Sequence, residues 1–159
     1  MNDLVKTGAS MNRGRSKQDY CTPRDFLAAV DKRFGWPDFD LAADINNAIT
    51  PGAFFDEPRD SLKQSWADIS GLLFCNPPFG NVTPWAKKCA EESQRGARIL
   101  LLTPASSGAD WFQSYCVRYG YVLDLAPRLS FDGKNPFPKD VVLTSFQFGL
   151  VGRGFWRWK

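Results

Sequence analysis

The sequence of 159 residues contains no histidine. Without an imidazole, the Ser-His-Asp and Cys-His nucleophiles, a histidine general base and histidine-ligated zinc are all excluded. The four cysteines, Cys21, Cys75, Cys89 and Cys116, form no CxxC pair. We therefore expect buried, reduced thiols and no metal site, and any catalysis must use other groups.

Long apolar stretches are also lacking. No run approaches the roughly 20 residues that a membrane-spanning helix needs, and the first residues lack the apolar centre of a signal peptide. A cytoplasmic protein is therefore expected. The composition, with 43% hydrophobic and 23% charged residues, suits a soluble globular domain. The net charge of +3 permits a polyanionic partner without demonstrating one.

The pattern of the chain predicts one domain preceded by a tail. Residues 1–18 are rich in Gly, Ser, Asn and cations and have no apolar periodicity, so a flexible basic N-terminal tail is expected there. Residues 19–159 are long enough to form a single hydrophobic core. The domain is expected to begin with a helix for which Thr22 is the N-cap, Pro23 the first residue and Gly35 the stop.

Short apolar segments alternate with helical patterns in the rest of the domain. Helices are expected at 83–95 and 108–118, with one or two helical turns in 60–66. Strands are expected at 39–44 (with its exit loop), 53–55, 72–75, 98–103, 121–125 and 141–150. This alternation predicts an α/β sheet that is mostly parallel, with an antiparallel C-terminal strand.

One junction carries more chemical information than the rest of the chain. Asn76-Pro77-Pro78-Phe79 follows directly on the apolar run 72–75. The prolines end the strand, because proline has no N–H and pushes the preceding residue into an extended conformation. In an open α/β sheet, ligands bind beyond the carboxyl ends of the strands. The tetrapeptide is therefore expected at a binding site, and a rigid surface turn is the alternative.

These groups suit the methylation of a planar amino group such as N6 of adenine. Its lone pair is delocalised into the ring, so the amine is a poor nucleophile. Two acceptors for its N–H protons, the Asn76 side-chain oxygen and the Pro77 carbonyl, would restore density to the nitrogen in the transition state. Phe79 offers a stacking face worth about 1–3 kcal/mol. The base would have to be flipped or single-stranded to reach such a site.

The junction belongs to an ordered series of motifs that runs from about Asp19 to Leu150. The series consists of DYCTP, FDLAAD with Asn47-Ala48, Asp60-Ser61-Leu62 with Trp66, NPPF, Pro84-Trp85, ILLLTP, Asp110-Trp111-Phe112 and Arg128-Leu129-Ser130-Phe131. It resembles the small phage-type DNA N6-adenine methyltransferases of the class I S-adenosylmethionine-dependent group. The resemblance implies a single-domain Rossmann-like sheet with helices on both faces. It also implies site-specific methylation of a flipped adenine in DNA, of use in protection from restriction.

The resemblance further implies a set of site residues. Asp40 would contact the ribose or the amino-acid moiety of S-adenosylmethionine, and Asp60 its adenine amino group, with Asp56 and Glu57 as competitors for that role. The expected cofactor-binding residues are Tyr20, Thr22, Pro23, Asp40, Ala42, Asp60, Ser61 and Asn76. The expected catalytic residues are Asn76, Pro77, Pro78 and Phe79.

DNA is the expected partner, and its contacts are the least defined part of the sequence. Arg128, Lys134 and Lys139 precede the last expected strand, on a stretch that resembles the substrate side of the family, and cations there could meet phosphates. The segment 153–159 interleaves cations with aromatic residues. Such a segment could contact DNA or could pack against the sheet of the protein itself.

Two alternatives remain open at the level of the sequence. The same acceptor geometry could serve another planar NH₂ group, namely cytosine N4, an RNA adenine or a protein glutamine. The first strand is followed by Leu41-Ala42-Ala43-Asp44, without the glycine-rich loop that is common in methyltransferases. A nucleic-acid-binding module without turnover is therefore the second alternative.

Overall fold

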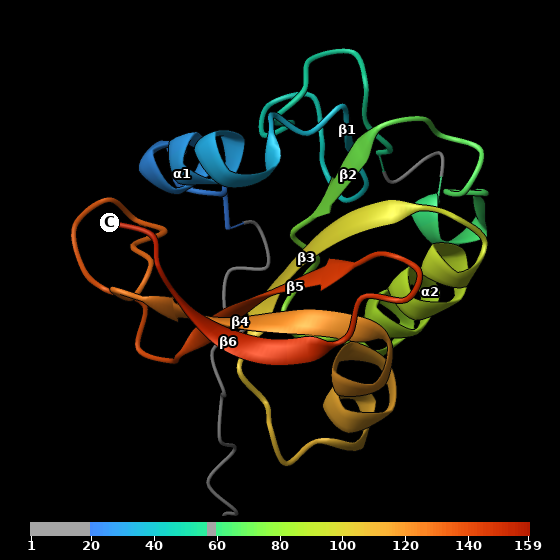
Figure 1. Ribbon diagram of the computed structural model, residues 1–159. Helices are drawn as coiled ribbons and strands as arrows, with labels where there is room; N and C mark the ends of the chain where they lie inside the picture. Colours follow the sequence, from blue (N-terminus) through green and yellow to red (C-terminus); the bar gives the residue numbers. More distant parts are fainter. Residues whose placement is uncertain (1–19, 57–59) are drawn as a thin grey trace, which may run out of the picture.

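The computed structural model describes residues 20–56 and 60–159, so the expected tail at 1–18 and the competitor Glu57 lie outside the described residues. Its described strands form one six-stranded sheet, and the helices lie around that sheet (Figure 1). In chain order they are α1 (Arg24–Phe34), β1 (Phe39–Asp40), η2 (Ser61–Lys63), β2 (Leu72–Cys75), α2 (Thr83–Gln94), β3 (Arg98–Pro104), η3 (Phe112–Val117), β4 (Gly120–Ala126), β5 (Val141–Phe146) and β6 (Gly152–Arg157).

The strands have the order β1-β2-β3-β5-β4-β6. β1, β2 and β3 are parallel neighbours, β5 runs antiparallel between β3 and β4, and β6 is parallel to β4. The predicted α/β class, with its mostly parallel sheet and antiparallel C-terminal strand, is confirmed. The expected short strand near 53–55 is a single bridge between Asp40 and Phe54.

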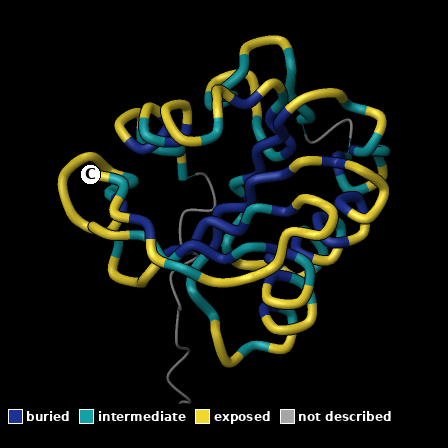
Figure 2. Tube along the Cα trace, viewed as in Figure 1, coloured by how far each residue is buried: buried dark blue, intermediate teal, exposed yellow. Residues whose placement is uncertain are grey.

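The core has two layers, one on each face of the sheet. β2 is buried along its whole length, and β3 from Ile99 to Thr103, because both faces are covered (Figure 2). The α1 side chains Phe26, Leu27 and Val30 share a buried cluster with alternate residues of the central strands. α2 and η3 pack with the other set of strand residues. Each fully buried Leu or Phe side chain contributes about 1.5–3 kcal/mol, and this burial fixes the strand ends that form the site.

The strand β6 departs from the expectation for the C-terminal segment. The expected strand 141–150 ends at Phe146, and a turn closed by the Leu150 N–H and the Gln147 carbonyl (3.0 Å) leads into β6. Gly152 lies against the Tyr121 ring, where a Cβ would come within 2.7 Å of Cε2. The sequence left two interpretations of 153–159 open, and in the structure this segment packs against the sheet of the protein.

Two local expectations were wrong. Thr22 does not cap α1, which has Pro23 at its N-cap position and no side-chain cap, because the Thr22 hydroxyl accepts a hydrogen bond from Asn76 instead. Cys21 is exposed, whereas Cys75, Cys89 and Cys116 are buried free thiols as expected. The expected helix at 108–118 is present, with a π-helical core at η3.

The described residues contain neither a membrane-spanning helix nor a group of metal-binding side chains. None of their helices is long and apolar enough to cross a membrane. Nor do residues 20–56 and 60–159 contain a group of three or more Cys, Asp or Glu side chains that could hold a metal ion.

Candidate functional site

A cavity of about 660 Å³ opens where the parallel strands β1 and β2 end. The segments that follow the two strands, residues 20–22 and the start of η2 line this cavity. Of the expected cofactor-binding residues, all but Pro23 line the cavity, namely Tyr20, Thr22, Asp40, Ala42, Asp60, Ser61 and Asn76. Residues that are up to 56 positions apart in the chain thus share one site.

Asn76 lies half-buried directly after β2. Its amide nitrogen donates to the Tyr20 carbonyl at 2.7 Å and to the Thr22 hydroxyl at 3.1 Å. Both bonds use the donor end of the amide, and no described residue donates to Oδ1. These two bonds fix the plane of the amide and leave the acceptor capacity of Oδ1 unused by the described residues.

The two prolines of the junction differ in their surroundings. Pro78 lines the cavity, and its carbonyl accepts the Asn81 N–H at 3.2 Å. Pro77 is buried, and no described residue hydrogen-bonds to its carbonyl. Pro77 itself does not line the cavity, and among the described residues its carbonyl keeps its full acceptor capacity.

Phe79 does not line the cavity. Its ring lies in a group of four aromatic rings, with centroids 5.7 Å from Tyr20, 5.8 Å from Phe131 and 5.8 Å from Phe137. Phe131 and Phe137 come from the loop between β4 and β5, and the Phe137 N–H bonds the Leu129 carbonyl at 2.7 Å. This aromatic group joins the junction, the N-terminal segment and that loop.

Asp40 closes the floor of the cavity at the end of β1, with 3% of its surface exposed. Burial raises the pKa of its carboxyl to about 6, although hydrogen bonds from the N–H groups of Ile49 and Ala42 favour the ionised form. A buried carboxylate with a raised pKa in a cavity is a characteristic of functional sites.

Asp60 and Ser61 form the opposite wall of the cavity. Asp60 has a left-handed backbone with φ of 43°, an unfavourable conformation for a residue with a Cβ. Its carboxylate pairs with Lys63 at 2.8 Å. The Ser61 hydroxyl is buried and has no hydrogen-bond partner within the described part of the chain. A buried polar atom without a partner in a cavity wall fits a ligand that supplies one.

Sequence reasoning missed several residues of this site. Phe55 and Trp85 add aromatic surface to the cavity, and Asn47 and Asp44 add polar groups. Asp56, a competitor of Asp60 in the sequence, also lines it, so the cavity holds both. The side-by-side position of Asp40 and Phe54 in the sheet explains Phe55, but no local pattern in the sequence marks that pairing.

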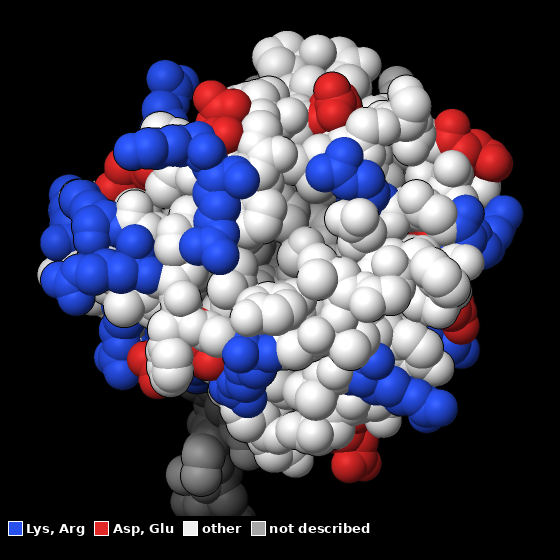
Figure 3. All heavy atoms as spheres, in the orientation of Figure 1, with Lys and Arg blue, Asp and Glu red and all other residues white. Residues whose placement is uncertain are grey.

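The expected DNA-contact residues lie outside the cavity, in the loop between β4 and β5. Arg128, Lys134 and Lys139 are exposed, and Arg128 pairs with Asp140 at 2.9 Å. Figure 3 shows lysine and arginine side chains gathered around this loop, α1 and the C-terminus, on the left of the view. In the C-terminal segment, Trp156 is buried whereas Phe155 is 87% exposed.

Two comparisons with known proteins bear on the family of this chain. A family model described as DNA N-6-adenine-methyltransferase (Dam) matches residues 10–131, from the N-terminal segment to Phe131. A DNA N-6-adenine-methyltransferase of Escherichia phage T1 is 29% identical over 93 residues, which are 58% of this chain and 38% of that protein. The match thus spans about two-fifths of the length of that relative.

Proposed function

Because the chain belongs to the DNA N-6-adenine-methyltransferase (Dam) family, we propose that it transfers a methyl group from S-adenosylmethionine to N6 of an adenine in DNA. The observation that carries this proposal is the orientation of the Asn76 amide. Its nitrogen is held by Tyr20 and Thr22, which leaves the oxygen of this cavity-lining residue available to accept a hydrogen bond from a substrate.

The junction activates the amine. Asn76 Oδ1 and the Pro77 carbonyl accept hydrogen bonds from the two N–H groups of the adenine amine, which favours a pyramidal nitrogen with a localised lone pair for attack. Attack by this nitrogen would break the methyl–sulfur bond of the bound sulfonium donor and leave a neutral thioether, and the cationic amine would then lose a proton to solvent. The acceptors favour the transition state over the ground state because they stabilise the positive charge that develops on the N–H groups.

S-adenosylmethionine fits the residues that line the cavity, and when bound it supplies an electrophilic methyl group. Asp40 and Asp60 provide carboxylate acceptors for its hydroxyl and amino groups, and the Ser61 hydroxyl is an unpartnered polar group beside them. Phe55 and Trp85 provide apolar surface for its adenine ring. The small side chain of Ala42 takes the place of a glycine-rich loop and lets a ligand approach the backbone closely.

The target base reaches the junction from the side of the aromatic group. Phe79 and its neighbours offer ring surface for a flipped adenine, which explains why the group lies beside the cavity and not within it.

The exposed cations of the β4–β5 loop are proposed to bind phosphates. We expect the double variant Lys134→Gln/Lys139→Gln to weaken DNA binding at low salt and to reduce the slope of log K against log salt by about 1 for each phosphate that is no longer neutralised. Fluorescence anisotropy over a salt series measures that slope. Lys87→Gln in α2 is the matched control, because Lys87 is an exposed lysine paired with Glu91 away from this loop. A slope unchanged in the double variant would remove these residues from the interface.

The direct test of the function is the transfer of labelled methyl from S-adenosylmethionine to unmethylated DNA, followed by nucleoside analysis. We expect N6-methyladenine. Label on N4-methylcytosine, RNA or a protein glutamine would identify another amine as the substrate. A folded protein that binds DNA but shows no affinity for S-adenosylmethionine in calorimetry would be a binding module without turnover.

A further inference from the structure

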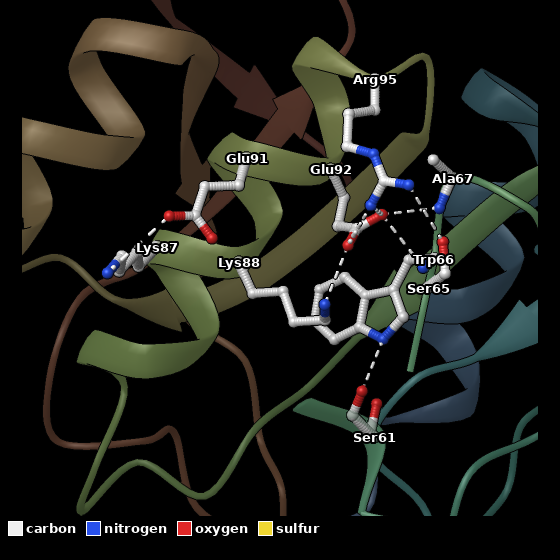
Figure 4. Close-up of polar contacts among 9 residues, drawn as sticks. All are labelled: Ser61, Ser65, Trp66, Ala67, Lys87, Lys88, Glu91, Glu92 and Arg95. Carbon is white, nitrogen blue, oxygen red and sulfur yellow. Dashed lines mark hydrogen bonds and ion pairs between the residues drawn. The ribbon is translucent and has the colours of Figure 1, made fainter. Parts of the chain in front are cut away.

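Glu92 is a buried carboxylate that lies outside the cavity, on α2. It is 4% exposed, and carboxylates are almost never buried to this extent unless they are paired. Figure 4 shows what pairs it: the backbone N–H groups of Trp66 (3.0 Å) and Ala67 (2.8 Å), the Lys88 ammonium (2.8 Å) and the Arg95 guanidinium (3.3 Å). A side chain of α2 thus binds two backbone amides of the segment that follows η2.

Trp66 continues this chain of interactions toward the cavity. Its side chain is fully buried, and its indole N–H donates to the Ser61 carbonyl at 2.9 Å (Figure 4). Its ring stacks on that of Trp85, with centroids 6.2 Å apart and an interplanar angle of 25°. The Lys88 ammonium lies 5.0 Å from the centre of the Trp66 ring. Ser61, which accepts the indole hydrogen bond, and Trp85, which stacks on the Trp66 ring, both line the cavity.

The cavity wall that contains Ser61 has too little secondary structure to fix its own geometry. η2 is a single 3-10 turn of three residues, and Asp60 before it has a strained left-handed backbone. So short a helix has too few internal hydrogen bonds to be stable alone. Its geometry must come from tertiary interactions, and among the described residues the Trp66 indole donates a hydrogen bond from the core to the first residue of η2.

We propose that Glu92 is a positioning residue of the cofactor site, which fixes Trp66 and thereby holds the Ser61 wall in the geometry that binds an adenosyl ligand. The inference rests on the proposed function, since it assigns that ligand to the cavity. Glu92 touches neither ligand nor reacting atoms. Its effect is on ligand affinity, transmitted through the indole.

The charge of Glu92 is suited to this task. Burial alone would raise its pKa, but the hydrogen bonds from Lys88 and from the Ala67 N–H and the charges of Lys88 and Arg95 outweigh burial and lower it. The carboxylate therefore stays ionised at neutral pH and offers acceptors to both backbone amides. Both amides donate to one oxygen, Oε2, whereas Lys88 and Arg95 lie at Oε1. A glutamine that keeps its oxygen at the amides places its NH₂ against these two cations, so it loses both ion pairs and offers Trp66 and Ala67 only a weaker, neutral acceptor.

The test compares Glu92→Gln with Glu91→Gln, the same substitution at the neighbouring position of α2. Glu91 is exposed and pairs with Lys87 at 3.8 Å, on the side of α2 away from Trp66 (Figure 4). The probe is S-adenosylhomocysteine, titrated by calorimetry without DNA, well below the unfolding temperature of each variant. We expect the Kd of Glu92→Gln to rise about five- to fiftyfold, in line with the loss of a charged hydrogen bond. Its kcat at saturating cofactor should stay within about twofold, and Glu91→Gln should bind as the wild type does.

Each outcome has one meaning. A folded Glu92→Gln variant with unchanged Kd and only a lower unfolding temperature would overturn the positioning role while leaving the proposed function intact. A folded wild type that does not bind S-adenosylhomocysteine would instead refute the proposed function, and this inference with it. If Glu92→Gln does not fold, Trp66→Phe takes its place, since it keeps a ring and removes the N–H to Ser61. The same loss of affinity is then expected, and an unchanged Kd would contradict the inference.

Discussion

Asn76→Ala is expected to lower kcat for methyl transfer about 10²- to 10³-fold, the range for removing one preorganised polar group from a transition state. The substitution removes the amide oxygen that we propose accepts a hydrogen bond from the adenine amine, and no described residue donates a hydrogen bond to that oxygen. The Kd of S-adenosylhomocysteine should change no more than a few-fold, because Asp40, Asp60 and Ser61 remain in the cavity. Single-turnover kinetics with saturating cofactor and DNA measures the chemical step separately from binding.

The control for this variant is Asn81→Ala. Asn81 is exposed in the same loop, and its backbone N–H bond to Pro78 survives the substitution. Its kcat should equal that of the wild type. Thr22→Val adds an intermediate case, since it removes only one of the two anchors of the Asn76 amide and should lower kcat about 2- to 12-fold. Full activity in Asn76→Ala would refute the acceptor role.

Asp40→Asn is expected to weaken cofactor affinity about 10- to 100-fold at pH 8 and to remove its pH dependence, because hydrogen bonds to a charged group are worth about 1.5–3 kcal/mol. In the wild type, burial raises the Asp40 pKa to about 6. A ligand that donates hydrogen bonds to the carboxylate binds the ionised form. Affinity should therefore rise with pH up to about 6 and then level off, falling up to tenfold per pH unit below that value.

The sign of this dependence follows from linkage. A ligand that favours the ionised carboxylate lowers its pKa in the complex, so binding releases a proton near pH 6 and is weakened by acid. Calorimetry of S-adenosylhomocysteine binding in buffers of different ionisation enthalpy measures that release. Asp68→Asn, an exposed carboxylate outside the cavity, should keep the wild-type profile. A flat profile in the wild type would show that the ligand does not contact Asp40.

Local sequence signals predicted the ends of strands well. A buried run that stops at two prolines placed Asn76 at the carboxyl edge of β2, and the short carboxylate-rich segment at 39–44 placed Asp40 beside it. Both signals are local, since proline chemistry and apolar runs act within a few residues. The α/β class followed from the same alternation of runs and helices.

Long-range interactions account for most of what the sequence did not predict. The hydrogen bonds from Asn76 to Tyr20 and Thr22 join residues more than 50 positions apart, and they override the helix cap that the local pattern at Thr22 favours. The sequence did not predict β6, because glycine is a poor strand former. The glycines of β6 are explained only by the Tyr121 ring, which is distant in the sequence and leaves little room for a Cβ. Glu92 resembles any other charge on an amphipathic helix until its partners 25 and 26 residues away are known.

A crystal structure of the chain with S-adenosylhomocysteine bound tests the central claim most directly. We predict that the adenosyl part lies between Asp40 and the Asp60-Ser61 wall, with the sulfur directed at Asn76 Oδ1 and the Phe79 side of the junction. Density for the ligand elsewhere, or a sulfur turned away from Asn76, would contradict the claim that this amide presents an amine to the methyl donor.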